Sequence, residues 1–525
     1  MKWEKKILLV VLILLGVGFT LVGAINWTRG QGDNAIQADW LKTMALTGKP
    51  RSQILASVND MVLNMKLVTK TAEEMQSLPL PAKNYDNANM FVYHVVPIYY
   101  LISPLVRILP MELIMGLIMA FSFLGILVLL YIFLRKRGVG IAIAMAFCLL
   151  ISSHPAWNQS VFGQVYSDRL FLMVGMFFVV VVSDKKSKLW QLFLVVFLVF
   201  TMIERMLVVG GIFLIMYSIL YRANLGVKQR WSRFVLGLFL LLWAGVIIKL
   251  YLRNPFYSSF FSFNSLESLG SFLMSTLVLN EKMKLFLIFN LMPLIILGVW
   301  EWRAAIIAVV MLLPNIFGNV GGAEKTGWST HYHSTYFPFL VWALSACFIN
   351  FYKRIEAKKR ILIIVPLIGL TMLTWGVSPY SLEGLKLSLT NVRSNAWVRS
   401  YNMMIDFVTR GGIYETSKKM ADDLRRVVPE GSSVSVSEYM MVTLVNNRKL
   451  YLYPSGLDEV DYVVIWTSDL KVKPPKYRGM VSFLGEEEKG KIDDVLSARM
   501  EKLGYDVYNP TMIGDVAVIK KIKNL

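Results

Sequence analysis

Apolar runs alternate with short polar loops along the first 376 positions of the chain. The runs at 7–24 and 111–134 are close to the length of about 20 residues at which an apolar helix crosses a bilayer. Shorter runs follow residues 137 and 169. Further spans are expected near 234–251, 285–300, 304–318, 336–352 and 361–376. The pattern predicts an α-helical polytopic membrane protein with about eleven transmembrane helices.

The run at 190–221 is too long for one crossing, and Glu204 and Arg205 interrupt it near the middle. A single span would also place the basic segment 222–233 on the opposite side from the other basic loops. We therefore predict a tight hairpin of two short helices with Glu204 and Arg205 at its tip.

A long loop, residues 26–93, follows the first span. Apolar residues recur in it at spacings of three and four between Ile54 and Val68, which predicts an amphipathic helix suited to the membrane surface. The stretch VVPIYYLISPLVRIL from Val95 contains two prolines and is too short to cross, so it is predicted to be a re-entrant or interfacial helix.

The last part of the chain has a different pattern. Short apolar strands (SSVSVS, KLYLY, DYVVIW, DVAVIK) alternate with a helical stretch, SKKMADDLRRVV, and with turn signals such as PEG and YPSG. This pattern favours a small α/β domain. We expect a transmembrane module at 1–376, which includes the loop 26–93, and a separate α/β domain at 377–525.

The net charge of +20 sets topology rather than indicating nucleic-acid binding. The loops assigned to the cytoplasm contain nineteen Lys and Arg and four acids, and so account for +15 of the total. The N-terminus is therefore predicted to be cytoplasmic and the C-terminal domain extracytoplasmic, in the cell membrane. The N-terminal segment resembles a signal sequence, and we expect it to remain as an anchor. Cys148 and Cys347 lie in apolar runs, which favours buried thiols over a disulfide or metal site.

All four histidines, His94, His154, His331 and His333, fall where a predicted span meets the outer side. Titratable groups are costly inside hydrocarbon, so their position on one face predicts a polar site that opens there. Sequence alone does not show that the loops carrying them meet.

Two acids follow the first span, Asp33 and Asp39. Asp33, at the start of a predicted helix, is either a general base at the membrane surface or an N-cap carboxylate. The two acids are six residues apart and point to different sides of one helix, so they do not form a catalytic pair. Asp39 is retained as a candidate metal ligand.

A second polar loop ends in Asp168 and Arg169. Asp168 is predicted either to cap the following helix or to bind metal or substrate. Glu204 and Arg205 are candidates for substrate binding, with a local ion pair or a snorkelling pair as the alternative.

A late glycine-rich loop contributes Lys325, His331, Tyr332 and His333. Histidines at i and i+2 could ligate a metal from an extended segment, but Lys325 with the two histidines suits a phosphate cradle at least as well. Acids from early loops and cations from a late loop fit displacement at a sugar carbon, where a base removes the acceptor proton and cations stabilise the departing phosphate.

Several longer motifs carry a family resemblance: GDNAIQAD at 32–39, YHVVPIYYLISPL at 93–105, IERMLVV at 203–209, HYHSTYFPFL at 331–340, and the tail pattern from VPEGSS to DYVVIW. With these motifs the chain resembles the GT-C superfamily of membrane glycosyltransferases. It resembles more closely a family of predicted prokaryotic membrane proteins of unknown function. The similarity spans most of the chain.

The resemblance implies inverting sugar transfer from a polyprenyl-phosphate donor to a glycan, lipid or protein acceptor of the cell envelope. Asp33 matches the catalytic acid of the superfamily by position. Asn34 stands where many relatives have Glu, so a divalent cation such as Mg or Mn would need Asp39 or Asp168. His94, Asp168, Arg169, Glu204, Arg205, Lys325, His331, Tyr332 and His333 are then the predicted substrate-binding residues.

The alternative is a lipid or solute transporter or flippase. Such proteins commonly show repeated halves and charged or broken helices at mid-membrane. This chain shows no evident repeat, and its charged candidates lie at span ends.

Overall fold

The computed structural model describes residues 2–28, 32–57, 89–92, 94–161, 165–250, 281–317, 331–376, 412–437, 440–447, 449–453, 455–466 and 500–522. These residues belong to two compact units. The helical unit comprises Met1–Asn26, Phe91–Leu101 and Glu112–Val408. The α/β unit comprises Trp27–Met90, Ile102–Met111 and Thr409–Leu525.

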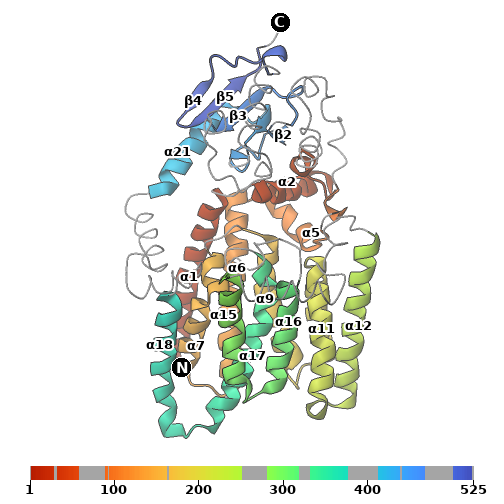
Figure 1. Cartoon of the computed structure of the whole chain (residues 1–525), viewed down its shortest axis with the longest axis vertical. Helices are drawn as coiled ribbons and strands as arrows, with labels where there is room; N and C mark the ends of the chain where they lie inside the picture. The colour runs from red at the N-terminus through yellow and green to blue at the C-terminus, as the bar shows by residue number, and fades with distance from the viewer. Residues whose placement is uncertain are drawn as a thin grey trace. The chain divides into compact units, whose positions relative to one another are not determined.

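The long helices of the helical unit run roughly side by side (Figure 1). They begin with α1 (Lys2–Thr28), whose last residues belong to the α/β unit. The others are α6 (Met111–Lys136), α7 (Ile141–Ser153), α8 (Pro155–Val161), α9 (Leu170–Ser183), α10 (Leu189–Phe200), α11 (Glu204–Leu220), α12 (Val227–Leu250), α15 (Glu281–Gly298), α16 (Trp302–Phe317), α17 (Phe337–Arg354) and α18 (Ile364–Gly376). Each predicted apolar run therefore corresponds to a helix.

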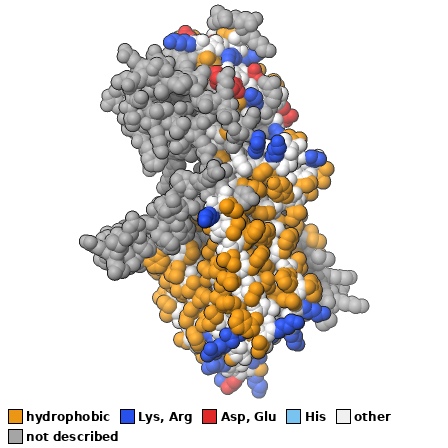
Figure 2. Space-filling model, turned by 90° about the vertical axis from the view of Figure 1, so that its right-hand side faces the viewer, with side chains coloured by type: hydrophobic (Ala, Val, Ile, Leu, Met, Phe, Trp, Pro, Cys, Tyr) orange, Lys and Arg blue, Asp and Glu red, His pale blue; other side chains and the backbone are white. Residues whose placement is uncertain are grey.

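The surface of these helices is suited to a membrane. Within the described residues, Met111–Lys136 and Val227–Leu250 are long and apolar enough to cross a bilayer. Shorter apolar helices occur at Val10–Ala24, Ile141–Ser153, Leu189–Phe200, Met283–Gly298 and Trp302–Phe317. Figure 2 shows hydrophobic side chains covering the bundle, with Lys and Arg gathered toward its lower end in that view. Leu242 and Ile295, 63% and 73% exposed, are examples of the large apolar side chains on this surface, which is typical of a membrane-facing bundle.

The predicted hairpin at 190–221 is confirmed. It consists of α10 and α11, joined by a turn at residues 201–203. The next pair, α11 and α12, packs closely because Gly211 and Gly237 face each other: a Cβ on either would lie 2.8 Å from the other's carbonyl oxygen. Small residues at such crossings let helix backbones approach closely in membranes.

The stretch from Val95 is helical and short, as predicted. It forms α5 (Ile98–Ile102) and a 3-10 turn at Ser103–Arg107, before α6 begins at Met111. Its place in the membrane remains a prediction.

The α/β unit contains a five-stranded sheet of order β2-β1-β3-β5-β4. The strands are β1 (Ser433–Val436), β2 (Lys449–Leu452), β3 (Tyr462–Trp466), β4 (Thr511–Ile513) and β5 (Val516–Lys520). Strand β1 pairs in parallel with β2 and β3, and β5 pairs antiparallel with β3 and β4. The four strands predicted in the tail are β1, β2, β3 and β5, and the predicted tail helix is α21 (Gly412–Val427).

The domain division differs from the prediction, which placed the loop 26–93 with the spans. Ala56 lies in the hydrophobic core of the sheet, together with Tyr451 and Val463. Ser57 joins the edge strand β2: its Oγ accepts a bond from the Leu452 amide at 2.9 Å, and its carbonyl accepts one from Ser455 Oγ at 3.0 Å. These contacts place the loop with the tail. Of the amphipathic helix predicted over 54–68, residues 53–57 are helical and the rest lie outside the described residues.

Candidate functional site

Glu204 joins the hairpin tip to the segment before α5. It is the first residue of α11 and is completely buried. One carboxylate oxygen accepts a hydrogen bond from the Val95 amide at 2.9 Å, and the other lies 3.0 Å from His94 Nδ1. The helix N-terminus favours a carboxylate at this position. His94 and Glu204, 110 positions apart in the sequence, are thereby brought together, with the His94 side chain 38% exposed.

Arg205 joins two further segments. Its guanidinium forms an ion pair with Asp168 and lies over the Tyr332 ring, 5.2 Å from the centroid. The side chains of Asp168 and Arg205 are 6% and 19% exposed, so the pair is largely shielded from solvent. Glu204 and Arg205 do not pair with each other at the tip, because each is directed to a different partner.

Two neighbours, Arg169 and Tyr99, complete what we call the polar cluster, which consists of His94, Tyr99, Asp168, Arg169, Glu204, Arg205 and Tyr332. Arg169 is fully buried, with its guanidinium 5.6 Å from the centroid of the Phe123 ring. Tyr99 is also buried, and its hydroxyl hydrogen-bonds the side chain of Ser167, the residue before Asp168. Sequence reasoning did not single out Tyr99 or Phe123, although Tyr99 lies within the YHVVPIYYLISPL motif.

Two of the other histidines have packing roles. His333 is 1% exposed, with Nδ1 2.8 Å from the Tyr336 hydroxyl and its ring stacked on Phe286. His154 Nδ1 accepts a hydrogen bond from the Ala156 amide, so the proton is on Nε2, which donates to the Phe289 carbonyl at 3.2 Å. Both rings therefore hold helices together.

Two predicted groups of the late loop, Lys325 and the side chain of His331, lie outside the described residues. Their predicted contacts with a phosphate remain predictions.

The predicted base lies in the α/β unit. Asp33 is the second residue of α2 (Gly32–Thr47), and its side chain is outside the described residues. The next residue, Asn34, is completely buried, and neither polar atom of its side chain has a hydrogen-bond partner among the described residues. A glutamate here would bury an uncompensated charge, which gives a physical reason for the amide at this position.

Asp39 caps a neighbouring helix. Its Oδ2 accepts hydrogen bonds from Ser52 Oγ at 2.8 Å, from the Gln53 amide at 2.7 Å and from the Ile54 amide at 3.3 Å. These groups lie at the start of helical residues 53–57, whose first amides have no partner within their own helix. The geometry favours a capping role for Asp39 over the predicted metal role.

The far end of α2 is held in the same unit. Arg107 donates to the Ala45 carbonyl, with Nε at 3.0 Å, and so places a positive charge at the negative end of the helix dipole. Lys42 Nζ donates to the Val445 carbonyl of the tail at 3.2 Å. The helix that contains Asp33 is thus fixed to residues far away in the sequence.

Burial raises the pKa of Asp39 above its ordinary value of 3.8, and outweighs hydrogen bonds from Ser52, Ile54 and Gln53 that lower it. The stability that such a carboxyl group contributes is complete below pH 3.8 and is lost as the pH rises through the folded-state pKa.

An asparagine at position 39 keeps a hydrogen-bond acceptor for the cap without the negative charge. We therefore expect Asp39→Asn to retain or raise the melting temperature at neutral pH and to flatten its pH dependence. Asp39→Ala should cost about 1 kcal/mol through loss of the cap. Melting curves of the purified variants across the acidic and neutral pH range test this prediction. A lower melting temperature for Asp39→Asn than for Asp39→Ala would contradict it.

The described side chains contain no group of three or more His, Cys, Asp or Glu residues that could hold a metal ion. The polar cluster instead places two guanidiniums beside two carboxylates and one imidazole. Asp168 offsets the charge of Arg205, and Glu204 lies against His94. An anion that displaced Asp168 from Arg205 would find a guanidinium already oriented by Tyr332.

These features define a helical membrane protein with a buried polar cluster at helix ends and a small mixed sheet. Residues 63–510 match the family described as Predicted membrane protein (DUF2079). Because the match covers most of the chain, the protein belongs to this family, as the motifs predicted. No curated protein matches the chain.

Proposed function

We propose that the protein is a GT-C-type membrane glycosyltransferase that moves a sugar from a polyprenyl-phosphate donor to an acceptor on the extracytoplasmic face. In this proposal the chain crosses the cell membrane about eleven times, with a cytoplasmic N-terminus and an extracytoplasmic C-terminal domain. The helices of the bundle and the basic loops between them support this topology.

The observation that carries the proposal is the convergence of the polar cluster. His94, Asp168, Arg205 and Tyr332 come from four segments separated by long apolar helices, yet they are joined through direct contacts. The link between the His94 and Arg205 segments includes the Ile98 amide, which donates to the Thr201 carbonyl at 2.7 Å. Buried charged groups are energetically costly in a membrane bundle and commonly mark functional sites. The cluster is therefore a better candidate for donor binding than for packing.

The proposed reaction is an inverting displacement. The acceptor oxygen attacks the anomeric carbon, and the bond from that carbon to the phosphate oxygen breaks. Asp33 takes the proton from the acceptor, while polyprenyl phosphate leaves with the bonding electron pair. Arg205 and Arg169 stabilise the phosphate as its negative charge develops, and the His94 imidazole, oriented by Glu204, donates a hydrogen bond to it.

The proposal is tested with purified protein reconstituted in vesicles that contain polyprenyl-phosphate sugars, each with a radiolabelled sugar, and cell-envelope acceptors. We expect free polyprenyl phosphate to form together with labelled product, and thin-layer chromatography measures both. Movement of intact donor across the bilayer without product would instead establish the transporter alternative.

A further inference from the structure

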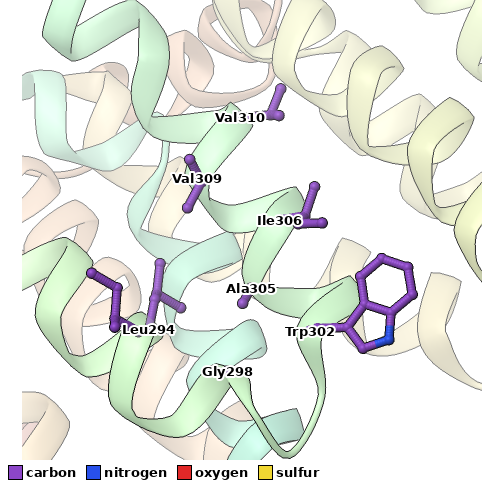
Figure 3. Close-up of a pocket in the computed structure, with 8 residues that line it drawn as sticks. Leu294, Gly298, Trp302, Ala305, Ile306, Val309 and Val310 are labelled. Carbon is purple, nitrogen blue, oxygen red and sulfur yellow. The ribbon is translucent and has the colours of Figure 1, made fainter.

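An apolar groove lies between α15 and α16 (Figure 3). Its volume is about 320 Å³, at the lower end of the roughly 300–1,000 Å³ of small-molecule sites. It is lined by Leu294, Ile295, Gly298, Trp302, Ala305, Ile306, Val309 and Val310. Gly298 and Ala305 leave the space open: a Cβ on Gly298 would lie 3.1 Å from that of Ala305. This lining is apolar, which suits an acyl chain rather than a polar molecule.

Two arginines flank the end of this groove. The guanidinium carbon of Arg303 lies 5.5 Å from the ring centroid of Trp302, which lines the groove. Arg354 lies 4.8 Å from the ring centroid of Trp300, in the turn between α15 and α16. Stacking on aromatic faces leaves the in-plane N–H groups of a guanidinium available to oxygen acceptors.

Neither arginine forms a salt bridge with a carboxylate among the residues that the structure describes. Glu301 is the acid of the same turn, and its oxygens accept hydrogen bonds from Tyr221 at 3.1 Å and Asn350 at 2.8 Å. Both of these donors are neutral, so by formal charge the two arginines and this one carboxylate leave a net charge of +1 at the groove end.

Apolar contact alone gives a groove in a membrane little preference for any lipid, since the surrounding chains are equally apolar. Headgroup charge therefore decides selectivity. A basic side chain near a membrane surface attracts anionic lipid by roughly fivefold, so a net charge of +1 at the groove end gives a preference of roughly fivefold.

We propose that this groove binds one anionic phospholipid, with an acyl chain between α15 and α16 and the phosphate at Arg303 and Arg354. Under the proposed topology this end of the bundle is cytoplasmic. The opposite end of α16 approaches the polar cluster, where Asn315 Nδ2 lies 3.5 Å from the Tyr332 carbonyl. The lipid site is thus separate from the donor site, and only its assignment to the cytoplasmic leaflet rests on the proposed topology.

Native mass spectrometry of the full chain in detergent tests the proposal, with phosphatidylglycerol and phosphatidylcholine of identical chains titrated in parallel. Wild-type protein should retain phosphatidylglycerol about fivefold more tightly than phosphatidylcholine. Arg303→Gln with Arg354→Gln should abolish that preference. Ala305→Leu, which fills the groove and leaves both arginines, should weaken retention of phosphatidylglycerol.

The matched control is Lys185→Gln with Lys358→Gln, which removes the same charge from two exposed residues that do not line the groove. It should keep the wild-type preference. Equal retention of the two lipids by wild-type protein, or equal loss in the control and arginine variants, would overturn the proposal. A dimer whose interface covers Ala305 and keeps lipid out of the groove would also overturn the proposal.

Discussion

Asp33→Asn is expected to lower the rate of sugar transfer by about 10²–10⁴-fold, the usual contribution of a positioned general base. Asparagine has nearly the same shape but cannot accept the acceptor's proton. Because the exchange removes no packing, expression and behaviour in detergent should be unchanged. Initial rates with the radiolabelled donor, at saturating and at limiting acceptor, measure the effect on kcat and on kcat/KM.

Asp39→Asn is the matched control, since it makes the same exchange on the same helix at a residue that caps a neighbouring helix. Its transfer rate should remain within about twofold of wild type, because it retains an acceptor for the cap. Full activity of Asp33→Asn would remove the base assignment. Equal loss in both variants would show that the activity responds to the fold of the α/β unit rather than to one carboxylate.

Much of the architecture follows from local pattern. Hydrophobic period and length are enough to predict α6 and α12, because a span is specified within its own sequence. The hairpin tip could be predicted because Glu204 and Arg205 interrupt a run too long for one crossing. Short β-branched runs between turn signals likewise predict β1 and β3.

What could not be predicted depends on contacts over long sequence distances. Nothing local to Ala56 indicates that it lies in the core of a sheet some 400 positions later. Nor does the spacing of histidines separate His94, partly exposed beside a carboxylate, from His333, which is buried against Phe286. Both sit at span ends in the sequence, and only tertiary packing distinguishes a site residue from a core residue.

Arg205 is expected to have two separable roles, one in stability and one in donor binding. Arg205→Gln breaks the ion pair with the buried Asp168, and breaking a buried ion pair costs about 3–5 kcal/mol. Adding Asp168→Asn removes the carboxylate of the broken pair, so the double variant should recover most of the lost stability. Thermal unfolding of the four proteins in the cycle measures this recovery.

Activity should not recover with stability. If Arg205 stabilises the departing phosphate, its loss lowers kcat/KM for the donor by about 10²–10³-fold in both the single and the double variant. Asp168→Asn alone keeps the guanidinium over Tyr332 and frees it from its carboxylate partner, so donor binding should be retained or tightened. A double variant that regained activity together with stability would assign Arg205 to packing alone. The divergence of the two measurements across one cycle therefore separates a phosphate-binding cation from a structural ion pair.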